Sequence, residues 1–318
     1  MNSDVGSAMN SAMNSDVGGA VSRVADRAVI EVEQPGPRAT VQDLGRPGFA
    51  ALGVGLSGAA DRGALRLANR LVGNPETAAC IELTLGGLCA RFHATALIAV
   101  TGASCPITID GRPSNAAMNA PFYAPAGALV RIGTPPRQLF TYLAVRGGID
   151  VPPVLGSRST DTLAGIGPAV LASGTELPIG HETDELPNVD LAVLRHPHRT
   201  TDRSGAVPLR ILPGPRTDWF EPDALSLLMS SAYTVTAETD RIGARLDGPE
   251  LRRARGGELR PEGMVRGALQ VPPSGRPILF LADHPVTGGY PVIAVVRAAD
   301  LDLAGQLRPG GLVRFRFG

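Results

Sequence analysis

Residues 277–296 read PILFLADHPVTGGYPVIAVV, and this stretch decides the fold class. Two short uncharged runs, 277–281 and 292–296, enclose a polar and glycine-rich island at 283–291. Short apolar runs rich in β-branched residues are typical of buried strands rather than helices. The island then either turns a β-hairpin, for which glycine is needed, or presents polar side chains to a ligand. These side chains belong to Asp283, His284, Thr287 and Tyr290.

The size and charge of the chain limit its organisation and its partners. A chain of 318 residues with 43% hydrophobic content is long enough for two cores, so we expect two domains. The formal net charge is +0, from 30 basic and 30 acidic residues. Without a global basic field, neither a nucleic acid nor a membrane surface is an expected partner.

The types of basic residue and cysteine exclude several kinds of site. The sequence contains no lysine, which excludes a Schiff-base lysine and a Walker-type phosphate-binding lysine. The cysteines, Cys80, Cys89 and Cys105, lie in apolar surroundings without a C-x-x-C pair, as is typical of buried thiols in a reducing compartment. With no signal-like N-terminus and no apolar run long enough to span a membrane, we expect a cytoplasmic protein.

The five histidines do not form a metal-binding pattern together with the cysteines, so no metal site is expected. Of these histidines, only His284 lies in a candidate ligand-binding loop. We interpret His284 as a structural residue in preference to a general base.

The composition divides the chain into four segments. Residues 1–27 are a low-complexity tail in which MNSDVG is repeated, and we expect this tail to be disordered. Residues 28–182 form a first half and residues 208–318 a second half. Between them, residues 183–207 form a linker that mixes charged residues, proline and small polar residues without periodicity. The tetrapeptide PGPR follows a strand-like run in both halves, at 35–38 and 213–216, and hints at a duplicated unit.

The pattern along both halves predicts a mainly β protein with few helices. Many short strand-like runs are separated by glycine and proline turns, which favours barrels or sandwiches. Asp110 and Gly111 predict a two-residue hairpin turn. A helix is expected from an N-cap at Asp61 to a stop at Gly73, and a shorter one at 222–230.

The densest polar run of the first half is TVQDLGRPG, at residues 40–48. Most of its side chains cannot face a core unless they are paired. Asp43 and Arg46, three residues apart, can form a structural ion pair that closes a turn. They can equally bind a substrate, with Arg46 clamping a carboxylate or phosphate and Asp43 orienting it or taking a proton, while Gln42 binds beside them.

The run GVGLSGAAD at 53–61 leads into the expected first helix. Glycines before a helix N-terminus suit an anion near Ser57, although Asp61 at the cap would compete with it. Ser57 lacks the second glycine of a nucleophile elbow, so a serine hydrolase is disfavoured. Two further clusters, YLAVRGGID at 142–150 and GSRSTD at 156–161, place arginine and aspartate beside small residues. They supply Arg146, Arg158 and Asp161.

These runs together resemble one family, which includes allophanate hydrolase subunit 2 and the C subunit of 5-oxoprolinase, and which has a biotin-dependent carboxyltransferase-type domain. The matching motifs extend from about residue 29 to 317. They are TVQDLGRPG, SGAAD, LANRLVGNP, ELTLGG, AVRGGID, LGSRSTD, PGPR, DRIGARLDG and ADHPVTGGYPVIA. The resemblance implies two tandem cyclophilin-like β-barrel halves with a few short helices.

The resemblance also implies an activity and partners. Relatives work with a companion, the B subunit of 5-oxoprolinase, which is similar to allophanate hydrolase subunit 1. The 5-oxoprolinase assembly also has an A subunit. It opens 5-oxoproline, a small-molecule amide, to glutamate while it hydrolyses ATP. We therefore expect an ATP-dependent 5-oxoprolinase subunit that is active only in complex.

Two alternatives remain open. One is a carboxyltransferase subunit that acts on urea or allophanate-type amides with carboxybiotin; this chain lacks lysine and cannot itself carry the biotin. The other is a regulatory protein paired with a kinase inhibitor. For the enzyme, the expected cleft has catalytic Asp43, Arg46 and Asp283. Its expected substrate-binding residues are Gln42, Ser57, Asp61, Arg146, Arg158, Asp161, Thr287, Gly288, Gly289 and Tyr290.

Overall fold

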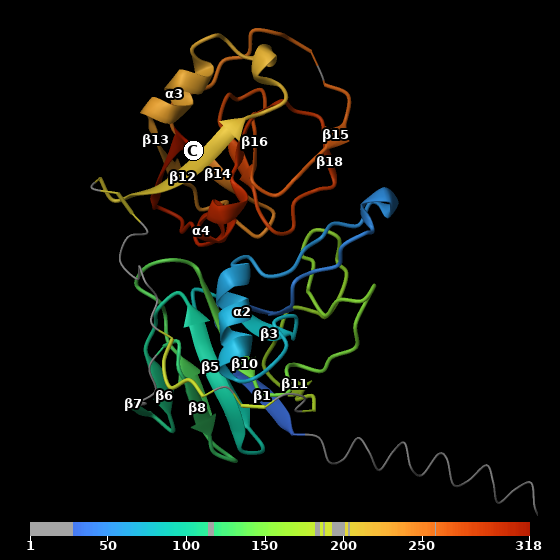
Figure 1. Ribbon diagram of the computed structural model, residues 1–318, viewed down its shortest axis with the longest axis vertical. Coiled ribbons are helices and arrows are strands. Elements are labelled where there is room, and N and C mark those ends of the chain that lie inside the picture. Colours follow the sequence, from blue (N-terminus) through green and yellow to red (C-terminus); the bar gives the residue numbers. More distant parts are fainter. Residues whose placement is uncertain are drawn as a thin grey trace, which may run out of the picture.

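The computed structural model has two halves that follow each other along the chain and stack end to end (Figure 1). The structure describes residues 28–113, 118–181, 185–186, 188–192, 201–202, 204–257 and 259–318. The tail expected at 1–27 lies outside the described residues, and so do residues 183–184, 187, 193–200 and 203 of the expected linker. The domain boundaries therefore stay a prediction.

Two sheets form the first half. One has the strand order β11-β1-β4-β9-β6-β7 and the other β2-β3-β10-β5-β8. Most neighbouring strands are antiparallel, and the turn between β6 and β7 is the expected two-residue turn at Asp110 and Gly111. The strands are β1 (Val29–Gln34), β2 (Arg38–Gln42), β3 (Cys80–Thr84), β4 (Leu88–Phe92), β5 (Ala96–Gly102), β6 (Ile107–Ile109), β7 (Arg112–Pro113), β8 (Pro121–Ala124), β9 (Leu129–Ile132), β10 (Phe140–Val145) and β11 (Thr175–Pro178).

The apolar residues of these strands explain the packing. Side chains from both sheets, such as Val32, Ile81 and Val130, form one buried cluster. The opposite face of the second sheet is covered by helix α2 (Arg62–Leu71), whose apolar residues Leu65 and Leu71 pack with Tyr142 of β10. Alternating side chains of one sheet can thus serve two apolar layers.

A closed barrel forms the second half, with the strand order β12-β19-β16-β17-β14-β13-β20. Its interior is filled by apolar side chains such as Leu209, Leu269 and Phe315. A separate two-stranded sheet joins β15 to β18. The strands are β12 (Ala206–Pro213), β13 (Ala232–Val235), β14 (Gly243–Asp247), β15 (Glu262–Gly263), β16 (Ala268–Gln270), β17 (Ile278–Phe280), β18 (Thr287–Gly288), β19 (Val292–Val296) and β20 (Leu312–Phe317).

Helices are few, so the mainly β fold class is confirmed. Asp61 caps α2 as expected, and the second expected helix forms as α3 (Ala224–Ser230), two residues inside its predicted start. The structure also contains α4 (Leu301–Gly305), which the sequence pattern did not indicate. Single turns of 3₁₀ helix occur at η1 (Ala50–Leu52), η2 (Thr217–Trp219) and η3 (Ala298–Asp300).

The hairpin interpretation of residues 277–296 is wrong. The two apolar runs are strands β17 and β19, but β16 lies between them and pairs with both. The barrel must close around its own core, and inserting β16 gives every one of these buried strands two hydrogen-bonded neighbours. The island at 283–291 is therefore a connection across the barrel end and not a tight turn.

The two halves meet where α4 faces the N-terminal end of α2 (Figure 1). Gly305 of α4 lies so close to the first half that an added Cβ would stand 2.1 Å from the Ala60 carbonyl oxygen. Among the described residues, each of the four apolar clusters belongs to one half only. Polar contacts therefore dominate the junction between the halves.

Candidate functional site

Arg241 is the centre of the polar junction. It follows β13 in the second half, and its side chain is 1% exposed. Its Nε and Nη2 atoms donate to the two carboxylate oxygens of Asp283, both at 2.9 Å, and Nη2 also donates to the Gly58 carbonyl at 2.6 Å. Nη1 donates to Glu82 of strand β3 in the first half. One guanidinium thus joins both halves, because its donors point in several directions.

Asp283 is the second member of this network and begins the island that follows β17. Its Oδ1 accepts from the Ser57 hydroxyl at 2.7 Å, and its Oδ2 accepts from the backbone N–H and the hydroxyl of Thr162 at 3.0 and 2.8 Å. Burial opposes its ionisation, but the charge of Arg241 and these hydrogen bonds together lower the pKa of Asp283. Asp283 is therefore an ionised acceptor that orients its partners.

Glu82 fixes the segment that precedes α2. Its Oε2 accepts from the Ala60 backbone N–H at 2.8 Å and from the Tyr142 hydroxyl at 2.7 Å. Tyr142 Oη in turn accepts from the backbone N–H of Asp61 at 2.7 Å. Burial and the neighbouring charge of Glu82 raise the pKa of Tyr142, which keeps this phenol neutral.

Ser57 adopts a backbone conformation that is rare for a residue with a side chain. Its φ is 53°, in the left-handed region, and its side chain is buried. The hydroxyl reaches Asp283 across the junction, and within the described chain no histidine bonds to either residue. Strained residues persist only where their surroundings hold them. The contact supports a positioning role for Ser57 and gives no support to a Ser-His-Asp triad.

The expected first-half residues lie in one pair of packed loops. Asp43 accepts from the hydroxyls of Ser157 and Ser159 at 2.7 and 2.5 Å, and from the backbone N–H of Arg158 at 2.6 Å. Arg46 is buried beside them and donates to the Ser159 carbonyl. The motifs at 40–48 and 156–161, far apart in sequence, therefore form one structural unit.

Several polar atoms of this unit lack a hydrogen-bond partner among the described residues. They are Gln42 Oε1, Thr160 Oγ1, and Nε and Nη1 of Arg46. Arg46 Nη1 does lie 3.8 Å from Asp161 Oδ2, which is a loose ion pair. Buried polar groups are normally satisfied, so this loop pair is the part of the expected site that is best able to accept a polar ligand.

The N-terminal end of α2 does not offer a free anion site. Asp302 of α4 accepts from the backbone N–H groups of Arg62 and Gly63, each at 3.0 Å. Helix N-terminal N–H groups attract any nearby anion. The carboxylate of Asp302, which belongs to the second half, thus occupies the place where we expected a substrate anion. Here the helix terminus binds the other half of the protein.

Asp61 is a titratable group at the same place. Its Oδ1 accepts from Ala64 N and its Oδ2 accepts from Gln306 Nε2 at 2.8 Å. Burial, with a smaller effect from Asp302, raises the pKa of Asp61 to about 6. Gln306 also accepts from the backbone N–H groups of Leu139 and Phe140, so one amide side chain anchors α4 to the first half.

Two more arginines and a histidine border the junction. Arg266 donates to the carbonyls of Ala60 and Leu301, and its side chain is 9% exposed. Burial and the positive charge of Arg266 lower the pKa of Arg62. Nε of both arginines lacks a hydrogen-bond partner among the described residues. His284, partly exposed, follows Asp283 directly.

Other expected site residues lie elsewhere. Arg146 donates to Val72 at the C-terminal end of α2, the end opposite to the junction. Arg158 extends to Asp150 at 2.7 Å. Thr287 and Gly288 form β18 on the small outer sheet, and Gly289 precedes Tyr290, whose ring lies 5.5 Å from the Arg253 guanidinium. The structure thus groups Gln42, Asp43, Arg46, Ser57, Asp61, Asp161 and Asp283. Arg146, Thr287, Gly288, Gly289 and Tyr290 lie outside this group, and Arg158 belongs to it only through its backbone N–H, since its side chain extends to Asp150.

A groove of about 500 Å³ lies in the second half, away from the junction. Its lining mixes charges of both signs, Arg252, Arg253 and Arg255 with Glu221 and Glu250. Arg255 is paired with Asp218 at 2.9 Å. The groove thus has little excess of either charge, and the junction remains the stronger candidate on chemical grounds.

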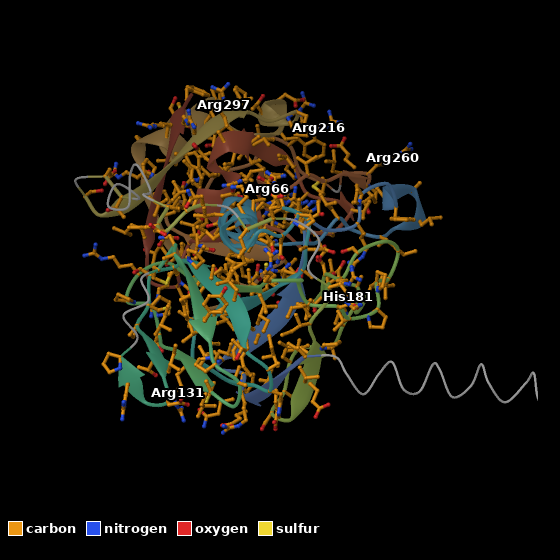
Figure 2. The ribbon with its side chains drawn as sticks, turned by 60° about the horizontal axis from the view of Figure 1, so that its bottom comes forward. Arg66, Arg131, His181, Arg216, Arg260 and Arg297 are labelled. Carbon is orange, nitrogen blue, oxygen red and sulfur yellow. The ribbon has the colours of Figure 1, made fainter. Side chains whose placement is uncertain are left out.

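Arginine side chains are spread over the whole molecule. In the view of Figure 2, Arg131 lies near the bottom and Arg297 near the top, with Arg66, Arg216 and Arg260 between them. The described residues contain no group of three or more His, Cys, Asp and Glu side chains that could hold a metal ion. No helix in the described parts of the chain is long and apolar enough to cross a membrane.

Sequence reasoning missed the residues that hold the junction together. Glu82 is a charged residue inside the apolar strand CIELT, and Arg241 stands in the turn TDRIG. A carboxylate in a strand buried on both faces must have a cationic partner, so Glu82 itself was a usable signal. The identity of that partner, 159 residues away, had no local signal.

Comparison with protein families gives a match to the family described as carboxyltransferase domain, subdomain A and B, over residues 52–317. Among individual proteins, the chain is 36% identical to the C subunit of 5-oxoprolinase from Escherichia coli K12 over 90% of both chains. It is 34% identical to urea amidolyase of Lachancea kluyveri, over 90% of this chain but 17% of that protein.

Solved structures show the same fold. The chain named TTHA0988 matches with a TM-score of 0.80 and 35% identity over 92% of this chain. The urea carboxylase of Kluyveromyces lactis matches with a TM-score of 0.82 and 31% identity. This chain spans 56% of the TTHA0988 chain and 27% of the urea carboxylase chain, so both of those chains include further segments.

Proposed function

This chain belongs to the carboxyltransferase domain family, subdomains A and B, and on that basis we propose that it is the C subunit of an ATP-hydrolysing 5-oxoprolinase. The observation that carries the proposal is the 36% identity to the C subunit of 5-oxoprolinase over 90% of both chains. The assembly would open 5-oxoproline to glutamate.

Opening a lactam requires activation, because its nitrogen is a poor leaving group. Transfer of a phosphoryl group from ATP to the lactam oxygen would create a labile intermediate. Such a reaction needs cationic groups that stabilise oxyanions in a site from which water is excluded. Arg62 and Arg266, whose Nε atoms are unpaired among the described residues, are our candidates to bind the substrate carboxylate or a phosphate.

The junction network would hold this site in place. We propose that Asp283 and Asp43 orient their partners, since each of them accepts several hydrogen bonds. Arg46, Gln42 and Asp161 would form the polar wall opposite. Binding of a lactam there would satisfy donors and acceptors that have no partner within the described chain.

We further propose that the companion A and B subunits bind next to this site. Large apolar side chains are exposed on loops of the first half, including Leu52 at 75% and Leu163 at 48%. Exposed apolar side chains of this size are typical of protein interfaces when they form a patch. All three cysteines are unpaired and buried, which supports assembly in the reducing cytoplasm.

The runner-up function is carboxyl transfer to urea or an allophanate-type amide. The observation in its favour is the match to urea amidolyase and urea carboxylase, with a TM-score of 0.82 for the latter. Because this chain has no lysine, carboxybiotin would have to arrive on another protein. A regulatory role with a kinase inhibitor is a third alternative, which predicts effects on a kinase without amide turnover.

The test is to purify this chain together with the A and B subunits and to measure glutamate formed from 5-oxoproline with ATP. We expect turnover by the complete assembly and none when this chain is omitted. If the assembly is inactive but transfers CO₂ from a biotinylated carrier to urea, the runner-up is correct. A kinase effect that survives Arg266→Ala and Asp283→Asn, without amide turnover, would support regulation instead.

A further inference from the structure

The imidazole of His284 is held in one orientation at the edge of the junction. Its Nδ1 lies 2.8 Å from the Pro285 carbonyl oxygen. A carbonyl only accepts hydrogen bonds, so Nδ1 carries the proton and Nε2 has the free lone pair. The ring also stacks on Phe280, with centroids 6.1 Å apart and planes 25° apart. Both contacts restrict rotation of the side chain.

The charges that face His284 come from both halves. Arg266 of the second half and Arg62 of the first half oppose a further positive charge, while Asp283 favours it. Burial has the largest effect, and together these influences lower the pKa of His284. The imidazole is therefore neutral at pH 7, in the form that accepts a proton.

His284 is also accessible, unlike the buried network behind it. The side chain is partly exposed, and Nε2 has no hydrogen-bond partner among the described residues. Its backbone lies against the first half at Gly55, where an added Cβ would stand 3.5 Å from the His284 carbonyl oxygen and 3.8 Å from Asp161 Oδ2. The His284 backbone thus lies close to Gly55 and Asp161, and its imidazole lies close enough to Arg62 and Arg266 for their charges to act on it.

We infer that His284 is a catalytic base of this site, with Nε2 taking the proton from the amide N–H of the lactam. The inference rests on the proposed function. As the lactam oxygen attacks the γ-phosphorus of a nucleoside triphosphate, the new O–P bond forms and the bond to the diphosphate breaks. The N–H electron pair forms the C=N bond of an O-phosphoryl imidate, and the proton goes to Nε2. The leaving group is the nucleoside diphosphate.

Matched substitutions separate this role from a structural one. His284→Asn keeps a side-chain N–H near the Nδ1 position, so the hydrogen bond to Pro285 can persist while the base is lost. His284→Ala leaves space for added imidazole. His93→Asn is the control, because His93 is an exposed histidine that pairs with Glu31 on the outer surface of the first half.

The experiment measures glutamate formation by the assembled subunits as a function of pH. We expect His284→Asn to lower kcat about 100-fold, within the usual range for loss of a general base, and His93→Asn to have no effect. The wild-type kcat/KM should fall as the pH drops through the lowered pKa of His284, and this acidic limb should vanish in His284→Asn. Imidazole should restore part of the activity of His284→Ala.

Other results would overturn the inference. If the activity of His284→Asn stays within about 3-fold of wild type, the residue is structural. The same conclusion follows if His284→Asn loses activity but keeps the acidic limb of its kcat/KM profile, and imidazole does not restore activity to His284→Ala. Asp61, with a pKa of about 6, is a second group whose titration would give an acidic limb in this range. If the limb disappears in Asp61→Asn but not in His284→Asn, it belongs to the Asp61 carboxylate. An inactive wild-type assembly would overturn the proposed function as well, whereas an active His284→Asn assembly would overturn this inference alone.

Nitrogen-15 NMR of the histidine rings gives a readout that does not depend on turnover. We expect the signal that is missing in His284→Asn to show the Nδ1–H tautomer and to titrate below the usual range. An Nε2–H tautomer, or titration at an ordinary pKa, would contradict the proposed role of Nε2.

Discussion

The interior of each half and the junction between the halves are built from opposite kinds of contact. Each interior is apolar, as around Leu269 in the barrel and Ile81 in the first half. The junction instead buries one guanidinium and two carboxylates, with Arg241, Glu82 and Asp283 all at most 2% exposed. Burial of apolar surface has no preferred direction, whereas charge-assisted hydrogen bonds fix direction and distance. The difference indicates that the interiors supply stability and the junction fixes the orientation of the two halves.

The largest effect is expected from Arg241→Met. This change leaves Glu82 and Asp283 buried without their cation, which costs about 3–5 kcal/mol of the free energy of unfolding. Denaturant unfolding measures it. The triple variant Arg241→Met, Glu82→Gln, Asp283→Asn removes all three charges and should recover most of that stability. If the single and triple variants are equally unstable, the junction depends on packing rather than on charge. The proposed difference between the apolar interiors and the ionic junction would then be wrong.

A core substitution tests the other side of the comparison. Leu269→Ala removes a fully buried side chain from the barrel and should cost about 2–4 kcal/mol. Because the affected cluster does not reach the first half, the cost should appear in the unfolding of the second half, followed by hydrogen exchange. Ile81→Ala is the matched change in the first half. Equal protection losses in both halves after either substitution would show that the two cores unfold as one.

Asp302→Ala should have a smaller effect. It removes the acceptor of two helix N-terminal N–H groups, which is worth about 1–2 kcal/mol. The loss should also expose the N-terminal turn of α2 to faster amide exchange at Gly63. Asp223→Ala, at the start of α3 where no side-chain cap bond forms, is the control and should change little.

The smallest effect concerns pH. The pKa of Asp61 is raised to about 6 in the folded protein from an ordinary 3.8, so the folded state holds this proton more tightly than the unfolded chain. Its contribution to stability is therefore complete below pH 3.8 and is lost as the pH rises to about 6. Partial exposure limits the change to about 1 kcal/mol. The measurement is the free energy of unfolding at about pH 4.5 and at about pH 7, and Asp61→Asn should remove about this much of the difference between the two values. If the difference is the same in Asp61→Asn as in wild type, another group causes the pH dependence.

The sequence predicted local structure well where the cause of that structure is local. Asp61 was identified as a cap because its side chain bonds a backbone N–H three residues away. Asp110 and Gly111 were identified as a turn because few residues accept positive φ at both positions. The pairing of β17 with β19 was predicted wrongly, since closure of a barrel depends on all of its strands.

The candidate site was predictable only in part. The loops at 40–48 and 283–291 were singled out by their polar residues, and the bond between Ser57 and Asp283 shows that the segments around them do meet. The residues around Arg146 and Tyr290 were expected to join them but do not. Glycine pairs at strand ends recur for reasons of backbone packing alone, so they did not distinguish the junction from the periphery.

By itself, the sequence determined the strand-rich fold class, the capped helix, the absence of lysine chemistry and the membership of a family, because each of these depends on residue type and local order. Only the tertiary structure decided which charges pair. Asp283 meets Arg241 across 42 residues and Arg241 meets Glu82 across 159. A buried charge must find a partner, but any residue that the fold brings close enough satisfies that requirement. The folding of both halves therefore selects the partner.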